Sequence, residues 1–244
     1  MLHDWYRAVQ LPMSLDEFHR LPRNPAYKYE YADGMAHLLP RPKTLNGLLD
    51  LQPLDAPQSI RALDLVTFRP LQLADWAEFP DLFTAAFRRV PPFAGLSEEE
   101  RLQASIECLE QTRTGGDGPP IASACFVAES RGQVLAGILV TLIPKREPGD
   151  WWDGHWLEPP PQNAAKLGLA RAHLTWVFVT PAYAGYGIGS VLLAHAANAL
   201  LAEGFLELAT TFLVGNEAST LWHWRNGFRL LPYPGSMRRI SQSG

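Results

Sequence analysis

The chain has 244 residues, of which 47% are apolar and 19% are charged. This length fits one large domain or one domain with an appendage, and the composition excludes a chain that is disordered throughout. The net charge of −4 does not favour nucleic-acid binding, the two cysteines do not make a disulfide framework, and no apolar run reaches the roughly 18 residues of a membrane span. We therefore expect a cytoplasmic protein without nucleic-acid or membrane partners, and the sequence leaves its oligomeric state open.

The first 60 residues differ in pattern from the rest of the chain. A hydroxyl at Ser14 and a carboxylate at Glu17 have the spacing of a capping box, which predicts a short helix over residues 15–20. Two aromatic or apolar runs then flank Asp33-Gly34, a pair that favours a tight hairpin turn. Several prolines follow. We interpret residues 1–60 as a small helix and hairpin extension with a linker.

Residues 61–244 alternate between apolar runs and helical patterns, interrupted by an irregular insertion at 144–170. This order predicts an α/β sheet with a helical crossover in its second half. The expected strands are 64–69, 122–129, 133–143, 172–179, 205–214, 228–231 and 236–241, and the expected helices are 71–89, 98–113, 188–202 and 216–225.

Residues 177–193 carry the most informative pattern: an apolar strand, a proline that ends it, three alternate glycines and a helix. Gly185, Gly187 and Gly189 allow a tight turn and a close approach to a ligand. The first N–H groups of the helix lack partners within the helix, and its positive dipole end faces the loop. The segment therefore predicts a phosphate or pyrophosphate site. Its spacing fits neither the dinucleotide fingerprint nor a P-loop.

The order of these motifs resembles that of the GNAT acetyltransferase superfamily, over about residues 64–240. The resemblance implies a mixed, mostly antiparallel central sheet with flanking helices in residues 61–244, beside the N-terminal appendage. It also implies acetyl-CoA as acyl donor, no metal, and direct attack by a small-molecule or peptide amine. The matching residues are Val179-Thr180-Pro181, Gly185, Gly187, Gly189, Leu192-Leu193, Asn216 and Gly227-Phe228.

The resemblance also implies where the donor binds. Strands 172–179 and 205–214 would splay apart to admit the pantetheine arm, and the glycine loop would hold the pyrophosphate. The implied cofactor-binding residues are Phe178, Val179, Ala184, Gly185, Tyr186, Gly187, Ile188, Gly189, Ser190 and Asn216.

Two positions depart from the family pattern. Ala184 stands where relatives carry Arg or Gln, which removes one charge-assisted contact. His223 stands where relatives carry a Tyr that often protonates the departing thiolate, so His223 is a candidate general acid, with a structural helix histidine as the alternative. On strand 172–179, His173 is the titratable group and a weaker candidate for relaying a proton from the amine. Alternation predicts that His173 shares a face with Thr175, Val177 and Val179.

Two further patterns are weighed against ordinary structural roles. Asp153 and His155 lie in the tryptophan-rich insertion, but without a third partner nearby they do not predict a metal site. The hairpin at residues 29–34 is similar to the opening of a restriction-endonuclease-like family. The later carboxylates that would hold Mg²⁺ are missing, so we interpret it as a structural element.

The sequence thus predicts an acyl-CoA-dependent N-acyltransferase. The alternative is a non-catalytic acyl-CoA-binding sensor or scaffold, which the changes at Ala184 and His223 would suit. A steady-state assay separates the two, because the second binds the donor without turnover of any amine.

Overall fold

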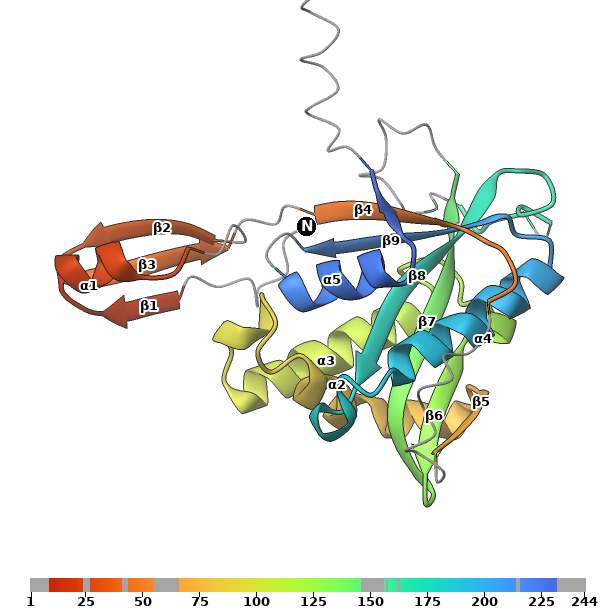
Figure 1. Cartoon of the computed structure of the whole chain (residues 1–244), viewed down its shortest axis with the longest axis horizontal. Coiled ribbons are helices and arrows are strands. Elements are labelled where there is room, and N and C mark those ends of the chain that lie inside the picture. Colours follow the sequence, from red (N-terminus) through yellow and green to blue (C-terminus); the bar gives the residue numbers. More distant parts are fainter. Residues whose placement is uncertain are drawn as a thin grey trace, which may run out of the picture.

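The computed structural model describes residues 9–23, 27–40, 44–54, 66–145, 156, 158–161, 163–213 and 216–231. These residues form a three-stranded sheet, in the order β1-β3-β2, and a seven-stranded sheet, in the order β10-β4-β9-β8-β7-β6-β5. Figure 1 shows the small sheet set apart from the larger one. The elements, with η for 3₁₀ helices, are β1 (Val9–Pro12), α1 (Leu15–Arg20), β2 (Tyr27–Ala32), β3 (Met35–Pro40), β4 (Thr44–Asp50), β5 (Val66–Pro70), η2 (Leu73–Ala77), α2 (Phe79–Ala86), η3 (Phe93–Gly95), α3 (Glu98–Arg113), η4 (Ala122–Ala124), β6 (Phe126–Ser130), β7 (Gln133–Pro144), β8 (Ala170–Val179), η5 (Pro181–Tyr183), α4 (Ile188–Ala202), β9 (Glu207–Leu213), α5 (Glu217–Arg225) and β10 (Arg229–Leu230).

The small sheet contains the predicted helix and hairpin. The Ser14 hydroxyl accepts from the Glu17 N–H, and the Glu17 carboxylate accepts from the Ser14 N–H, which together confirm the capping box at α1. Asp33 and Gly34 have φ values of 51° and 75°, as a primed hairpin turn requires between β2 and β3. β1, which the sequence analysis missed, pairs antiparallel with β3 and completes the sheet.

The seven-stranded sheet is antiparallel except where β8 and β9 run parallel, which confirms the mixed, mostly antiparallel α/β fold. Residues of α4 pack into an apolar core on one face of the sheet, and residues of α2 and α3 pack into a second core on the other face. Figure 1 shows these helices on either side of the sheet. No helix of the described residues is long and apolar enough to cross a membrane.

The N-terminal segment contributes a strand to the large sheet. β4 falls within the residues expected to form an extension and linker, yet it pairs along its full length with β9, and β10 pairs with its other edge. The linker interpretation of residues 44–50 was therefore wrong. Leu48 and Leu49 are buried, and a Gly at position 47 lets Thr210 and Phe228 pack closely against the strand. The prolines around residues 40–57 obscured this short strand in the sequence.

Two other expectations need correction, and some lie outside the described residues. The helix expected over 71–89 is split into η2 and α2, because Asp75 turns back to accept from the Gln72 N–H and Pro80 begins a new helix. The strand expected at 122–129 starts with η4, so β6 begins only at Phe126. The expected strand 236–241, Asp153, His155 and most of the insertion lie outside the described residues.

Candidate functional site

The parallel pair β8–β9 separates partway along its length. Its pairing runs from Ala172 with Leu208 to Leu174 with Thr210 and goes no further among the described residues. β8 continues to Val179 along β7, and β9 continues to Leu213 along β4. This confirms the predicted splay, which leaves one edge of β8 without a neighbouring strand.

A β-bulge at Thr175 marks the point of separation. Leu139 pairs with Trp176 and Val140 pairs with Leu174, so Thr175 is an extra residue on β8. The bulge reverses the alternation of side chains, and Val177 joins the core on the same face as Leu174. The expectation that His173, Thr175 and Val177 share one face was therefore wrong, because simple alternation cannot register an inserted residue.

The glycine loop begins directly after β8 and η5. Gly185 and Gly187 have φ values of 83° and 85°, a conformation that a side chain disfavours, and Gly187 is the N-cap of α4. Within the described part of the chain, the backbone N–H groups of residues 185–189 donate no hydrogen bond. A Cβ atom at Gly189 would lie 3.2 Å from Trp222 Nε1. The loop thus leaves a row of backbone N–H groups without acceptors, beside a position where a side chain at Gly189 would contact Trp222.

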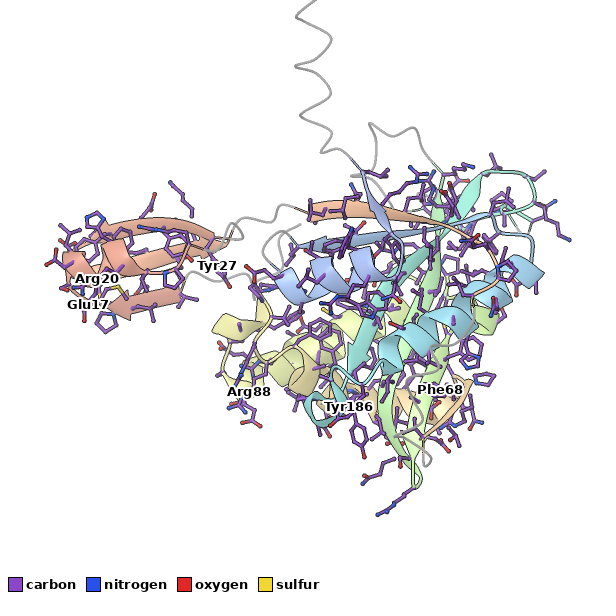
Figure 2. All side chains as sticks on the ribbon, viewed as in Figure 1. Glu17, Arg20, Tyr27, Phe68, Arg88 and Tyr186 are labelled. Atoms are coloured by element: carbon purple, nitrogen blue, oxygen red, sulfur yellow. The ribbon has the colours of Figure 1, made fainter. Side chains whose placement is uncertain are left out.

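A cavity of about 500 Å³, here called the loop cavity, lies between this loop, the end of β8 and α5. Tyr186 is not among its lining residues. Tyr186, which is labelled in Figure 2, is 54% exposed, so any contribution to the cavity comes from its backbone. The other predicted residues line it: Phe178, Val179, Ala184, Gly185, Gly187, Ile188, Gly189, Ser190 and Asn216.

A second cavity of about 310 Å³, here called the strand cavity, occupies the gap between β8 and β9. The segment after α2 forms one wall, and the rest comes from β8, β9, α5, Thr44 of β4 and Asp117. The two cavities share five lining residues, so the two spaces adjoin from the segment after α2 to the N-terminus of α5: Phe87, Val90, Val177, Asn216 and Ser219. Asn216 caps that helix by accepting from the Ser219 N–H at 3.1 Å, as predicted for a helix-opening Asn.

His223 lies at the bottom of the strand cavity and is only 3% exposed. Its ring stacks on Phe212 at 4.3 Å, and its Nδ1 lies 2.7 Å from the Ser219 carbonyl oxygen. Since a carbonyl can only accept, Nδ1 carries the proton and Nε2 accepts from Thr210 Oγ1 at 3.1 Å. Burial lowers the pKa of His223 to about 4. These contacts describe a neutral imidazole at pH 7 that orients the Thr210 hydroxyl.

His173 does not line either cavity but connects to one through a chain of hydroxyl groups. Its Nδ1 lies 3.1 Å from Thr175 Oγ1, which in turn lies 2.8 Å from Thr141 Oγ1. Its Nε2 lies 3.3 Å from Thr211 Oγ1. Burial, followed by the charge of Arg171, lowers the pKa of His173 to about 4. Thr175 and Thr211 line the strand cavity, so His173 reaches it through them.

Sequence reasoning missed several residues that the fold brings to these cavities. Arg225, in the last turn of α5, lines the same loop cavity as Ala184 and brings a cationic side chain to it. Asp117 and Thr175 line the strand cavity. The position of Arg225 on the helix that Asn216 opens was a usable signal, whereas Asp117 lies in an unpatterned turn. Among the described residues, no group of three His, Cys, Asp or Glu side chains could hold a metal.

Comparison with solved structures finds GNAT acetyltransferases. A GCN5-related N-acetyltransferase from Sphaerobacter thermophilus is 15% identical with a TM-score of 0.48, over 77% of this chain and 48% of that chain, so this chain spans about half of that protein. A GNAT family acetyltransferase from Brucella melitensis, in complex with acetyl-CoA, is 23% identical with a TM-score of 0.42, over 69% and 88% of the two chains. The PaiA N-acetyltransferase from Thermoplasma acidophilum, in complex with coenzyme A, is 15% identical with a TM-score of 0.45, over 67% and 89%.

None of the curated protein sequences compared with this chain matches it. The profile of the Acetyltransferase (GNAT) family, however, matches residues 76–228. That range covers more than half of the chain and includes the glycine loop, both splayed strands and α5. The chain therefore belongs to the GNAT acetyltransferase family.

Proposed function

We propose that the protein transfers the acetyl group of acetyl-CoA to a primary amine. The observation that carries this proposal is the junction of the loop cavity and the strand cavity at the splay of β8 and β9. Such a junction lets a donor and an acceptor enter separate spaces and meet at one point. When bound, acetyl-CoA supplies an activated thioester, whose acetyl group passes to the amine.

The residues of the loop cavity fit the donor. The free N–H groups of residues 185–189 and the N-terminus of α4 suit a pyrophosphate, and the unpaired edge of β8 at Phe178 and Val179 suits an amide-containing arm. We assign to Arg225 the electrostatic contact that Ala184 cannot make. Asn216 holds the end of α5 at the junction.

Proton transfer is the remaining task of the site. A cationic amine loses one proton to solvent before it attacks, and a second proton must leave the nitrogen as its bond to the acetyl carbon forms and the carbon–sulfur bond breaks. Thr175 Oγ1 lies on the wall of the strand cavity and contacts His173 Nδ1, so we propose that this pair passes the proton on, directly or through water. With its pKa near 4, His173 can transfer a proton but does not keep one at pH 7.

We assign His223 a positioning role in place of the general-acid role considered from the sequence. Its Nδ1 proton is held by the Ser219 carbonyl, and the imidazole has no second proton to give at pH 7. A thiol with an ordinary pKa, about 8.5 in cysteine, leaves readily as the thiolate. The site therefore needs no strong acid next to the sulfur.

The first test is binding. Thermal unfolding is followed with millimolar acetyl-CoA, and with free CoA and NAD as comparisons. A ligand at about 100 times its dissociation constant adds about 2.7 kcal/mol to stability, which is a clear upward shift. We expect this shift with acetyl-CoA and CoA and not with NAD.

The second test is turnover, measured as free thiol released from acetyl-CoA in the presence of a panel of primary amines. We expect amine-dependent thiol release, with the acetylated amine identified by mass spectrometry. Binding without turnover on any amine would replace the enzyme proposal by that of a sensor or scaffold. No binding at all would remove the donor assignment as well.

A further inference from the structure

One wall of the strand cavity consists of aromatic rings in fixed positions. Phe87 and Phe93 come from the segment after α2, and Trp176 comes from β8. The Phe87 ring centroid lies 5.5 Å from that of Phe93 and 5.9 Å from that of Trp176. Trp176 Nε1 donates to Thr112 Oγ1 at 2.9 Å, which fixes the indole. The wall is thus a preformed apolar surface suited to a flat ring.

The charge of the strand cavity is negative. Asp117 lines it, and its carboxylate accepts from Gln111 Nε2 and from Thr112 Oγ1, each at 2.6 Å. No Lys or Arg side chain is among the described residues that line the cavity, and His223 is neutral at pH 7. A ligand carboxylate in this space would lose its water without gaining a cation, and it would face a like charge.

The size of the cavity narrows the choice of ligand further. A volume of about 310 Å³ fits a single ring with a short chain. Thr175, Thr210 and Ser219 supply hydroxyl groups to its lining, and Ser219 also lines the loop cavity. A ligand with one amine and one apolar ring would therefore place each part against matching groups.

We infer that the acceptor is an arylalkylamine: a primary amine on a short chain that carries a flat aromatic ring and no carboxylate. The inference rests on the proposed acyltransferase function and concerns what enters the strand cavity. The ring lies on the wall formed by Phe87, Phe93 and Trp176, and the amine points to the junction. Asp117 attracts the cationic amine as it enters and excludes free amino acids.

The test is a calorimetric titration of three amines into the protein saturated with CoA: 2-phenylethylamine, phenylalanine and butylamine. Phenylalanine adds a carboxylate to the first compound, and butylamine removes the ring. We expect 2-phenylethylamine to bind at least about tenfold more tightly than either, since a lost charge or ring contact of about 1.4 kcal/mol has that effect. The titration is repeated without CoA, because protein residues alone form the cavity.

A variant tests the role of the carboxylate. In Asp117→Asn, the preference for 2-phenylethylamine over phenylalanine should fall to about threefold or less, because the like-charge repulsion is gone. Glu107→Gln is the matched control, because it removes a carboxylate from the exposed side of α3, and it should leave the preference unchanged. Thermal unfolding confirms that both variants are folded.

Two results would overturn the inference. One is that 2-phenylethylamine binds neither with nor without CoA. The other is that phenylalanine or butylamine binds as tightly as 2-phenylethylamine. These results are distinct from failure of the proposed function, which is read from acetyl-CoA binding and from thiol release over the whole amine panel. Acetylation of other amines with no selectivity for the arylalkylamine would leave the function standing and remove only this inference.

Discussion

The loop cavity and the strand cavity are built from different chemical groups. The loop cavity uses backbone N–H groups of residues 185–189, which glycines expose and the start of α4 orients. The strand cavity uses side chains from β8, β9, α5 and two turns, such as Trp176 and Asp117. A site that binds through backbone N–H groups can keep its ligand after a side-chain change such as Ala184. A site that binds through side chains alters its ligand preference when those side chains are substituted. The donor side therefore follows the family, and the acceptor side belongs to this chain.

The largest effect is expected at Gly187, where the backbone itself forms the site. In Gly187→Val the positive φ becomes strained, and holding the loop in its binding conformation costs about 3 kcal/mol, or about 100-fold in acetyl-CoA affinity. Titration calorimetry measures the affinity. Gly204→Val is the control, because Gly204 has a φ of 88° at the other end of α4 and lines neither cavity. Equal loss in both variants would show that strain in general, and not the loop, weakens binding.

The next effect concerns stability on the acceptor side. His223 has a pKa lowered to about 4 in the folded protein, against 6.5 as its ordinary value, so the unfolded state binds more protons between these values. Stability from this group is present above about pH 6.5 and is lost as the pH falls toward 4. Between about pH 7 and about pH 5, the loss amounts to about 2 kcal/mol.

His223→Phe keeps the ring packing and removes this titration. Urea unfolding should therefore show a free energy that falls less with pH in the variant than in the parent, by about 2 kcal/mol over that range. Part of the remaining slope comes from His173 and His195, whose pKa values are lowered by burial in the same direction. An unchanged slope in His223→Phe would show that folding does not lower the pKa of His223.

A variant that lacks the Thr175 hydroxyl tests proton transfer separately from acetyl-CoA binding. Thr175→Val keeps the shape of the side chain and interrupts the contacts with His173 and Thr141. We expect kcat to fall about tenfold, with acetyl-CoA affinity unchanged, because the proton loses its path. Thr67→Val, on the exposed side of β5, is the control. Unchanged kcat would remove His173 and Thr175 from the proton pathway.

The smallest effect is expected at Arg225, the one side-chain cation that we assign to the donor. Arg225→Gln should weaken acetyl-CoA binding about fivefold at low salt, since an exposed ion pair contributes about 1 kcal/mol, and less at high salt. Arg229→Gln is the control, because Arg229 is an exposed arginine that pairs with Asp50 and lines neither cavity. If Arg225→Gln lost more acetyl-CoA affinity than Gly187→Val, the contrast between the two cavities would be wrong, because a side chain would then contribute most to donor binding.

The sequence predicted the local structure around the loop cavity because the signals for it are local. Glycine spacing, the proline after the strand and Asn216 at the helix start lie within short segments and have direct backbone causes. The capping box at Ser14 and Glu17 and the Asp33-Gly34 turn were confirmed for the same reason. Such signals survive without any knowledge of tertiary contacts.

The acceptor half could not be predicted because it depends on contacts between distant segments. The bulge at Thr175 follows from the pairing of β7 with β8, and the strand that β4 adds beside β9 joins residues more than 150 positions apart. Asp117 lies at the strand cavity, where its carbonyl oxygen accepts from Thr141 Oγ1 of β7 at 2.9 Å. The low pKa of His223 likewise follows from burial among aromatic rings that the sequence does not bring together.

The most direct test of the account is the affinity of a bisubstrate compound, in which the sulfur of CoA is joined through an acetyl linker to the nitrogen of 2-phenylethylamine. If the loop cavity and the strand cavity meet at Val177 and Asn216, one molecule occupies both at once. The account predicts that it binds at least about 100-fold more tightly than CoA, because the second contact becomes intramolecular. An affinity equal to that of CoA would contradict it, because the two cavities would then not form one continuous site.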